Sequence, residues 1–442
     1  MISSWLIWWR RSRELTVSIA LTLLVALSLV TSALIWTGTP GQIAVDRPSF
    51  FSRATIGSHR SVTAVSIPSS MLLWTANNEL YRFSGDSQTV LGVLSALARA
   101  HVVSGQVHAS RSVPSLSGAF LQLNLNDFHA IATPVGMWLQ GPQWAGWPAI
   151  AGPLFLSPLA TQGHYTVRYQ TTRGIWIGVI KTVGAGVPAA FTPNIQSTPY
   201  ATVPFGTTPL DLPYDQIEMP ILDWTLAHPV TSHLVDAFFS DPTTAVGISD
   251  GPDSTLYTDG IRGVRVLGGP FGEVAEFLSP SVRLRGVKPD TMANLAAAVA
   301  AVNQNGGFVG QNFAALQRQT AAGQEFQFGE IVSGWPLFGS VGQMNVWVQD
   351  GNVVRLRRNL DYLQELLDEQ RVRVLSGSQL LSLLGSRTRG IVSIRLGFGA
   401  QMIAEDTVEL DPIYRLQYRS GRVQYLSAQT GNSFVETGMS GP

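Results

Sequence analysis

The sequence predicts an α+β fold, in which one N-terminal apolar helix precedes domains of antiparallel sheets with helices packed on them. One observation behind this prediction is an uncharged apolar run at residues 15–36. Another is a series of segments in which apolar and polar residues alternate, separated by Gly, Asp and Asn at turns. A third is the composition, with 43 Gly, 25 Pro and 13% charged residues, which is typical of a loop-rich protein that contains sheets.

Length, charge and cysteine content limit what the protein can do. The chain has 442 residues, more than one hydrophobic core usually serves, so we expect several domains. Acidic and basic residues number 29 each, and without an excess of positive charge we expect no nucleic-acid partner. The absence of cysteine excludes disulfides, thiol nucleophiles and cysteine-bound zinc.

The apolar run at residues 15–36 predicts a transmembrane helix, because at about 1.5 Å per residue it is long enough to cross a hydrocarbon core of about 30 Å. Arg10, Arg11 and Arg13 precede the run, whereas residues 37–45 contain no basic residue. These arginines therefore determine the predicted topology. We expect a single-pass protein of the cell membrane, with its N-terminus in the cytoplasm and its bulk outside.

Two features of this predicted helix leave alternatives open. Small residues at 31–33 also fit a cleaved signal peptide, although the run exceeds the roughly 7–15 apolar residues of such a signal. Ser18, Thr22 and Ala26 recur every four residues and share one helix face, where a partner helix can approach closely. The same face can instead meet only lipid. These three residues are the candidate partner-binding site.

The predicted domain organisation follows from composition and turn signals. We expect a basic cytoplasmic arm at 1–14, the transmembrane helix at 15–36, an N-terminal extracytoplasmic domain at 38–215, a central α+β domain at 216–365, and a small C-terminal α+β domain with a tail at 366–442. The Gly- and Pro-rich stretch from Gly184 to Pro213 predicts a linker or long surface loop at the end of the first of these domains.

Helices are predicted where apolar residues recur every three or four positions. Residues 90–103 form one such segment, and residues 291–305 form another between the capping Asp290 and the terminating pair Gly306-Gly307. Shorter helices are predicted at 233–239 and 376–385. Alternating segments predict strands at 120–125, 175–180, 254–267 with a turn at 259–260, 325–338, 344–349, 353–359, 390–398, 409–419 and 422–428, with tight turns at 350–352 and 420–421.

Apparent catalytic motifs do not fit the context that each of them needs. The segment 247–251 matches G-x-S-x-G around Ser249, but Pro252 and a predicted strand follow it instead of a helix. His228 and His233 are five residues apart with a proline between them, which does not place them on one helix face. His101 and His108 could meet across a turn, although a metal site there is not favoured. We therefore expect no enzyme, no cofactor and no metal site.

Basic residues recur on two predicted strands. Arg355, Arg357 and Arg358 lie on one of them, and Arg371 and Arg373 lie nearby. A basic sheet edge of this kind either discourages strand-to-strand aggregation or faces an acidic partner.

The ordered set of these segments resembles the YycH family, membrane-anchored regulators of the WalK (YycG) sensor histidine kinase of Gram-positive bacteria. The segments that carry the resemblance are SALIWTGTP, HLVDAFFSDP, LYTDGIRGVRV, the NQNGG turn at 303–307, FQFGEIVSGWPLF, VLSGSQLLSLL and LDPIYRLQYRSGRVQYL. They cover most of residues 15–36 and 228–428. Residues 38–215 carry none of these segments and are placed by position alone.

The resemblance implies a non-catalytic regulator of a two-component system that controls cell-wall homeostasis. It also implies three extracytoplasmic domains, the last two sharing a fold with the partner family YycI, and a transmembrane helix that contacts helices of YycI and of the kinase. The family has no catalytic residues to carry over, and the direction of its regulation differs among members. Two other classes stay open, an extracytoplasmic peptide- or glycan-binding module and a membrane-tethered cell-wall hydrolase.

Overall fold

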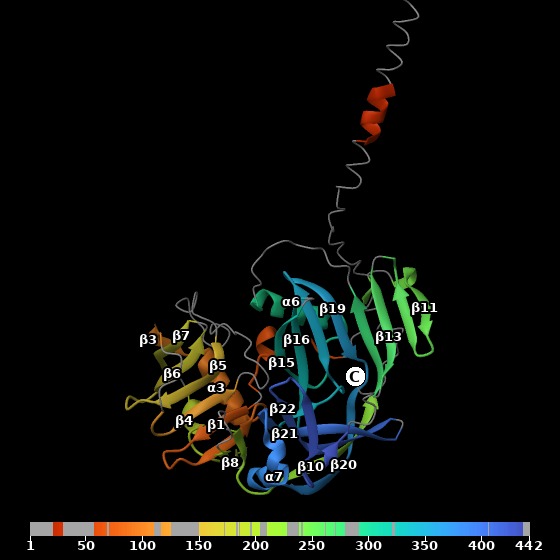
Figure 1. Cartoon of the computed structure of the whole chain (residues 1–442). Coiled ribbons are helices and arrows are strands. Elements are labelled where there is room, and N and C mark those ends of the chain that lie inside the picture. The colour runs from red at the N-terminus through yellow and green to blue at the C-terminus, as the bar shows by residue number, and fades with distance from the viewer. Residues whose placement is uncertain are drawn as a thin grey trace, which may run out of the picture. The chain divides into compact units, whose positions relative to one another are not determined.

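The protein, here a computed structural model, divides into two units, residues 1–52 and residues 53–442, which we describe separately. In the first unit the described residues form a helical segment at 21–29, and in the second they form two large sheets with few helices (Figure 1). The described residues are 21–29, 57–68, 70–109, 116–124, 150–171, 173–182, 184, 186–194, 197–203, 210–227, 238–239, 242–260, 262–269, 271–278, 291–320, 323–404 and 406–435.

The first sheet of the second unit is antiparallel and nine-stranded, in the order β3-β7-β6-β5-β4-β1-β2-β8-β9. Its strands are β1 (Ser70–Trp74), β2 (Leu80–Ser84), β3 (His101–His108), β4 (Phe120–Asn124), β5 (Ile150–Pro158), β6 (His164–Thr171), β7 (Gly174–Lys181), β8 (Ser197–Val203) and β9 (Leu210–Pro213). Helix α3 (Gln88–Ala98) covers one face of this sheet, and its N-cap Ser87 accepts a hydrogen bond from the backbone N–H of Val90. Met71 and Phe83 pack with Val93 of this helix in one hydrophobic cluster.

The second sheet has fifteen strands, twelve of them in the order β11-β12-β13-β14-β19-β18-β16-β17-β21-β22-β10-β20. The remaining pairs are β15 with β16, β22 with β23, and β23 with β24. The strands are β10 (Ile217–Ala227), β11 (Val246–Gly251), β12 (Ser254–Thr258), β13 (Gly263–Gly269), β14 (Gly272–Leu278), β15 (Gln311–Thr320), β16 (Gly323–Val332), β17 (Trp335–Phe338), β18 (Met344–Gln349), β19 (Asn352–Asn359), β20 (Tyr362–Val374), β21 (Ile391–Ala404), β22 (Thr407–Tyr418), β23 (Val423–Ser427) and β24 (Ser433–Phe434). Among the described strands only β17 and β21 pair in parallel, so the α+β prediction of mostly antiparallel sheets is confirmed.

Two longer helices accompany the second sheet. Helix α6 (Thr291–Gln304) packs Leu295 and Val299 against the sheet residue Phe326. Helix α7 (Gly377–Leu384) begins with a capping box, in which the Ser376 hydroxyl accepts from the backbone of Gln379 and the Gln379 side chain accepts from the backbone of Ser376. The short helices are α2 (Val62–Val65), α4 (Gly186–Ala189), η3 (Pro242–Thr244) and η4 (Gly385–Thr388).

Several local predictions are confirmed by these elements. The helix at 291–305 ends at Gly306 and Gly307, whose φ values of 100° and 80° are in the left-handed region that glycine tolerates. The hairpin turn between β18 and β19 places Asp350 and Gly351 at φ 50° and 79°, as a type I′ turn requires. The predicted strands at 390–398, 409–419 and 422–428 form the antiparallel set β21-β22-β23.

Two predictions about the first sheet are wrong. The helix predicted at 90–103 ends at Ala98, and residues 101–108 form β3 because their backbone pairs with β7. His101 and His108 therefore lie at opposite ends of one strand and do not meet across a turn. The segment from Gly184 to Pro213 is not only a linker or loop, because it contains β8 and β9, which extend the sheet next to β2.

The predicted basic edge is also wrong for residues 355–358. They lie on β19, which is interior to the sheet between β14 and β18. Arg355 pairs there with Glu276 and lies 4.6 Å from the ring centroid of Trp347, while buried Arg358 donates to the backbone oxygen of Asn305 over 2.6 Å. Arg358 is therefore buried and Arg355 is partly exposed, each with a partner within the structure, whereas Arg357 is exposed on the same interior strand.

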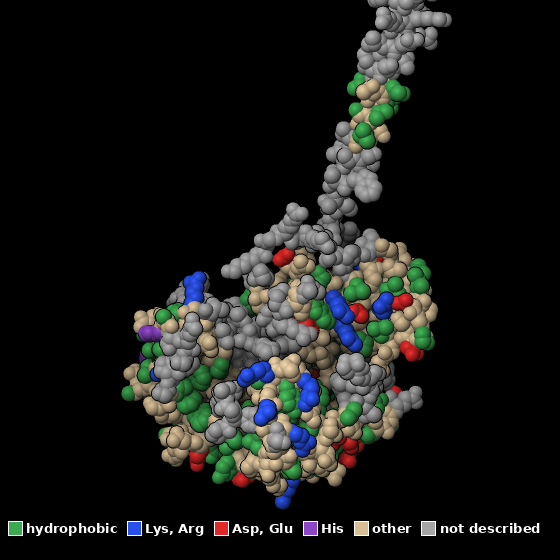
Figure 2. Space-filling view, in the orientation of Figure 1, with side chains coloured by type: hydrophobic (Ala, Val, Ile, Leu, Met, Phe, Trp, Pro, Cys, Tyr) green, Lys and Arg blue, Asp and Glu red, His purple; other side chains and the backbone are tan. Residues whose placement is uncertain are grey.

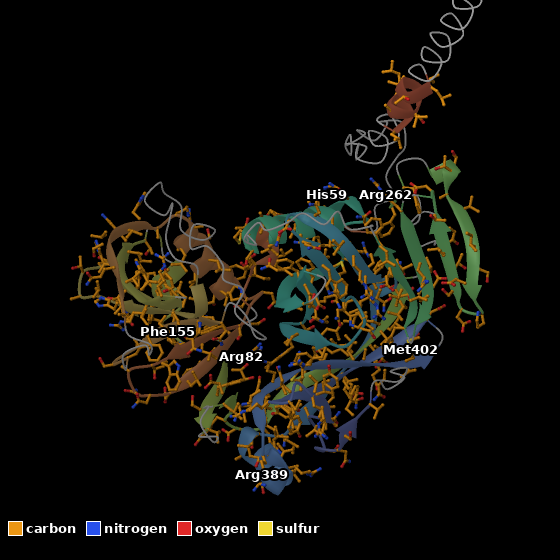
Figure 3. All side chains as sticks on the ribbon, turned by 45° about the horizontal axis from the view of Figure 1, so that its top comes forward. His59, Arg82, Phe155, Arg262, Arg389 and Met402 are labelled. Carbon is orange, nitrogen blue, oxygen red and sulfur yellow. The ribbon has the colours of Figure 1, made fainter. Side chains whose placement is uncertain are left out.

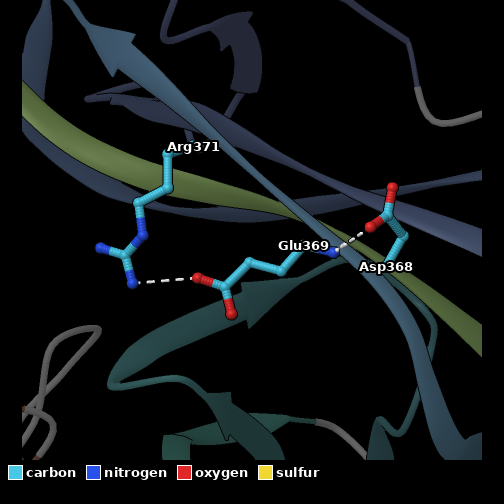
Figure 4. A network of polar contacts seen from close by, with 3 residues as sticks. All are labelled: Asp368, Glu369 and Arg371. Carbon is cyan, nitrogen blue, oxygen red and sulfur yellow. Dashed lines mark hydrogen bonds and ion pairs between the residues drawn. The ribbon is translucent and has the colours of Figure 1, made fainter.

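Arg371 does lie on an edge strand, β20. Its guanidinium forms an ion pair of 2.9 Å with Glu369, whose backbone N–H donates to the carboxylate of Asp368 (Figure 4). This edge strand therefore carries both acidic and basic side chains. Such mixed charge discourages pairing with another strand.

Some predictions lie outside the described residues. The helix predicted at 233–239 is described only at Phe238 and Phe239, and Asp290, His228 and His233 are not described. The finer division into domains at 38–215, 216–365 and 366–442 stays a prediction.

Buried Glu330 on β16 makes the stability of the second unit dependent on pH. Its side chain is 6% exposed and lies against Gly310 and Gly342, where any Cβ atom would collide with its carboxylate. Burial raises the pKa of Glu330 from 4.5 to about 8. The folded protein therefore keeps this proton between about pH 4.5 and 8, whereas the unfolded chain releases it.

We expect the contribution of Glu330 to the free energy of unfolding to fall as the pH rises from about 4.5 to 8, by about 1.4 kcal/mol per pH unit where only the unfolded chain is ionised. The Glu330→Gln variant keeps the shape of the side chain but has no group that titrates. We therefore expect its free energy of unfolding, relative to that of the natural protein, to rise between about pH 4.5 and 8. Urea unfolding at several pH values measures the difference, with exposed Glu365→Gln as the matched control. Parallel pH profiles for Glu330→Gln and the natural protein would contradict the assignment.

Candidate functional site

The first candidate site is the predicted partner-binding face of the N-terminal helix. Thr22 and Ala26 lie in the described helical segment at 21–29, four residues apart and so on one face. Ser18 and the arginines at 10, 11 and 13 lie outside the described residues. No helix among the described residues is long and apolar enough to cross a membrane.

The described part of this segment is exposed and apolar. Its large side chains are 53–66% exposed: Leu21, Leu23, Leu24, Val25, Leu27 and Leu29. They appear in Figure 2 as a hydrophobic surface along the segment. A contiguous apolar surface of this kind is stable in water only when a protein or a lipid covers it.

The second candidate site is a cavity of about 230 Å³ between the two sheets of the second unit, which we call the inter-sheet pocket. The first sheet lines it with Ser70, Leu72, Arg82, Gln122, Asn124, Tyr200, Leu210 and Asp211, and the second with Pro336, Val392, Ser393, Ile394, Arg395 and Leu396. A hydrophobic cluster to which both sheets contribute surrounds the pocket. The pocket is therefore part of the contact between the sheets.

The pairing register of the first sheet sets the wall of this pocket. Gln122, Leu72 and Arg82 are direct neighbours across β4, β1 and β2, and Asn124 and Ser70 form the row beside them. Successive side chains of a strand point to opposite faces of the sheet. The neighbours of these residues along each strand, such as Met71, Phe83 and Leu121, therefore pack toward α3. The face away from α3 is thus polar at the pocket.

Arg82 is the central charge of this wall. Its side chain is 8% exposed, and its guanidinium lies 4.0 Å from the ring centroid of Trp335 on β17. Figure 3 labels Arg82 on the first sheet. Burial lowers the pKa of Arg82, and the nearby Tyr200 and Asp86 act in the opposite direction. Arginine stays charged even so, because its ordinary pKa is far above neutral pH.

The opposite wall adds a second guanidinium. Arg395 on β21 lies directly across from Arg415 on β22. Burial lowers the pKa of Arg395 well below its usual range, and the positive charges of Arg415 and Arg82 lower it further. Like charges directly opposite on a sheet are destabilising. The fold therefore maintains a positive cluster at the pocket at an energetic cost.

The acidic and phenolic groups of the pocket offset this charge only in part. Asp211 accepts a hydrogen bond of 2.6 Å from the hydroxyl of Thr202, while burial raises its pKa. Burial also raises the pKa of Tyr200 to about 12, so the phenol is neutral at physiological pH. The lining thus holds two arginines and one aspartate.

The polar groups of the pocket can bind a charged ligand. Its two serines, Ser70 and Ser393, have no histidine among the lining residues to act as a general base. Ser249 of the G-x-S-x-G segment lies on the exposed edge strand β11. Among the described residues no three His, Cys, Asp or Glu side chains are grouped as metal ligands would be.

Sequence reasoning did not find Arg82 and Arg395. Each is the only charged residue in a largely apolar strand segment, Arg82 in LYRFS and Arg395 in IVSIRLGF. This pattern was the signal that the sequence offered. A charged side chain at such a position needs a polar surrounding when the strand is buried. That the two residues line one pocket depends on the tertiary fold.

A third structural feature links the first described residues of the second unit to helix α6, and we call it the N-terminal clamp (residues 57–60 with 303–308). The Asn303 side chain accepts from the backbone N–H of Arg60 over 2.9 Å and donates to the Arg60 backbone oxygen over 2.8 Å. Ser58 and Phe308 exchange two backbone hydrogen bonds of 2.8 and 2.9 Å. A Cβ atom on Gly307 would lie 2.8 Å from the Gly57 oxygen, so the close approach requires glycine.

The clamp gives the NQNGG segment a second role. The sequence predicted only that this segment ends a helix. In the structure it also binds the chain segment that follows residue 56.

The described structure defines the class of the protein as a mixed α+β protein of large antiparallel sheets with few helices. No family model matches the sequence, and no curated protein matches it significantly. The structure is similar to the crystal structure of YycH from Bacillus subtilis, with a TM-score of 0.66 over 84% of this chain and 98% of that one, at 14% identity. The YycH-like fold indicated by the sequence motifs is thereby confirmed.

Two other solved structures match less well. An uncharacterized protein from Eubacterium rectale has a TM-score of 0.35 and 10% identity over 53% of this chain and 93% of its own. The C-terminal domain of YpeB from Bacillus megaterium has a TM-score of 0.26 and 12% identity over 43% of this chain and 85% of its own.

Replacing Asn303 tests the clamp. The Asn303→Ala variant loses both side-chain hydrogen bonds to Arg60, each worth about 0.5–1.5 kcal/mol. We expect the backbone amides of Ser58 and Arg60 to exchange hydrogen roughly tenfold faster or more, without global unfolding. Hydrogen exchange by mass spectrometry measures this, with Asn352→Ala in the β18–β19 turn as control. Unchanged hydrogen exchange at residues 57–60 would show that the Asn303 hydrogen bonds do not stabilise this segment.

Proposed function

We propose that this chain is a non-catalytic regulator of a sensor histidine kinase of the WalK type, held at the cell membrane by a helix at 15–36. The observation that carries the proposal is the similarity of the fold to YycH, which covers 84% of this chain and 98% of the other. The ordered motifs of the sequence support it independently, because they resemble the same family. In this proposal the N-terminus is cytoplasmic and the second unit is extracytoplasmic.

The exposed apolar segment at 21–29 supports membrane anchorage. Its leucines and valine are 53–66% exposed, and the hydrocarbon core of a bilayer can cover an apolar surface of this kind. Arg10, Arg11 and Arg13 precede it, which favours insertion with the N-terminus inside.

Regulation of this kind needs no bond to be broken. A regulator that binds two signalling states of a kinase with different affinity shifts their ratio tenfold for about 1.4 kcal/mol. Contacts between helices in membranes supply about 0.6–2 kcal/mol each, so a few contacts along the face of Ser18, Thr22 and Ala26 suffice. In our proposal the partners are the kinase and a YycI-like protein.

The N-terminal clamp supports a connection between anchor and exterior. Residues 57–60 are fixed to the end of α6, and α6 packs on β16, β18 and β19. A change that is transmitted along the chain past residue 56 would therefore act on the end of α6.

The inter-sheet pocket favours a second candidate function, that of an extracytoplasmic binding module. The pocket lies between two sheets, and the charged and amide side chains in its lining can fix the orientation of a ligand. The two functions are compatible when a bound ligand changes what the regulator contacts. Nothing among the described residues favours a cell-wall hydrolase.

Substitution of the predicted helix face tests the proposed function. The triple variant Ser18→Leu, Thr22→Leu and Ala26→Leu places bulky side chains where a partner backbone would approach, and we expect at least about a tenfold loss of kinase co-purified from membranes. Ala20→Leu with Thr31→Leu, on the opposite side of an ideal helix, should leave recovery unchanged. Equal recovery for both variants would show that this face binds no partner. Mature protein in the medium, trimmed near residue 33, would show that there is no anchor.

A further inference from the structure

We propose that the inter-sheet pocket binds a small ligand through an oxyanion group, a carboxylate or a phosphate, which Arg82 and Arg395 hold from opposite sheets. This inference concerns ligand binding by the second unit and goes beyond the proposed regulation of a kinase. The inference depends on the geometry of the pocket and not on whether the partner is a kinase.

Arg82 is the first argument. Its side chain is more than nine-tenths buried and lines the cavity, and within the described part of the chain no oxygen accepts a hydrogen bond from its guanidinium. The contact with Trp335 places the guanidinium carbon 4.0 Å from the ring centroid, and the indole ring offers no lone-pair acceptor for the five N–H groups of the guanidinium. A buried guanidinium without acceptors is costly, and an oxyanion in the cavity would satisfy these donors.

The second argument is the sign of the charge. Arg82 and Arg395 are 313 positions apart in the chain, so only the contact between the sheets brings them to one cavity. Arg415 lies across the strand pair from Arg395 and adds to the repulsion. The one lining carboxylate, Asp211, is already hydrogen-bonded to Thr202. The local field therefore favours an anion.

The third argument is the polar lining and its size. Gln122, Asn124, Ser70 and Ser393 surround the cavity, and the Gln122 amide donates to the Asn124 oxygen over 2.8 Å. The amide and hydroxyl groups left over can bind further polar atoms of a ligand. A volume of about 230 Å³ is below the roughly 300–1,000 Å³ of sites for drug-sized ligands, so the pocket fits a small anion and not a folded partner.

The position of the pocket gives binding a structural consequence. An anion held by Arg82 from one sheet and Arg395 from the other would stabilise the arrangement in which both walls are together. Such a ligand would strengthen the contact between the sheets by replacing repulsion between the arginines with attraction to a shared charge.

Thermal unfolding of the purified full-length chain tests the proposal. The midpoint is measured against increasing inorganic phosphate and, separately, against increasing succinate, each at constant ionic strength made up with sodium chloride. Phosphate stabilises many proteins without binding, by exclusion from their surface. The variant Arg389→Met, which removes an equally charged but exposed arginine just before β21, shows the size of that general effect.

We expect a saturable rise of the midpoint in the natural protein and in Arg389→Met with at least one of the two anions. The Arg82→Met variant should weaken the apparent affinity roughly tenfold or more, leaving only the unsaturable general effect. The two anions separate a phosphate ligand from a carboxylate ligand. No saturable rise in the natural protein with either anion would overturn the proposal, and so would an equal rise in Arg82→Met.

A second variant keeps the test valid if Arg82→Met fails to fold. Ser393→Leu replaces no arginine, fills part of the cavity and removes the hydroxyl that accepts a hydrogen bond of 3.2 Å from Arg395. We expect it to lose the saturable rise while circular dichroism shows a folded protein. A folded Ser393→Leu variant with the full anion response would place the anion elsewhere and reject the pocket.

Discussion

The contact between the two sheets is the interaction on which the second unit depends. Leu72 and Tyr200 of the first sheet belong to one buried cluster with Trp335, Leu396 and Tyr414 of the second. Burial of apolar surface stabilises at about 25 cal/mol per Å², and here it must outweigh the repulsion of arginines that the same contact brings together. The stacking of Arg82 on Trp335 fixes one of these charges across the contact. Apolar packing and repulsion between arginines therefore act together at the contact between the two sheets.

This coupling suits a protein that acts by contact. An arrangement held by apolar burial and opposed by like charges has a smaller net stability than its buried area suggests, so a modest binding energy shifts it. The N-terminal clamp connects residues 57–60 to the end of α6, where Asn303 and Gly307 contact them. Helix α6 in turn packs on the second sheet. In the function we propose, the second unit would respond both to the proposed anchor and to a ligand between its sheets.

Sequence reasoning succeeded where a structure depends on neighbours in the chain. The turn at 350–352, the helix end at Gly306-Gly307 and the capped helix that begins after Ser376 all follow from local backbone preferences. It failed at β8 and β9, where Pro-rich sequence indicated a linker. Tyr200, Leu210 and Leu212 are buried there, and this burial outweighs the weak strand preference of the segment.

The sequence by itself determined the α+β class, most strands between Ser254 and Ser427, and the YycH-like arrangement of motifs, because period, turn and cap signals act over a few residues. Only the tertiary structure decided which strands are edges, so that Arg355 became interior and Arg371 lay at an edge. It also decided that Arg82 and Arg395 share a pocket. Pairing across hundreds of residues depends on packing and shape, which no local pattern of residues encodes.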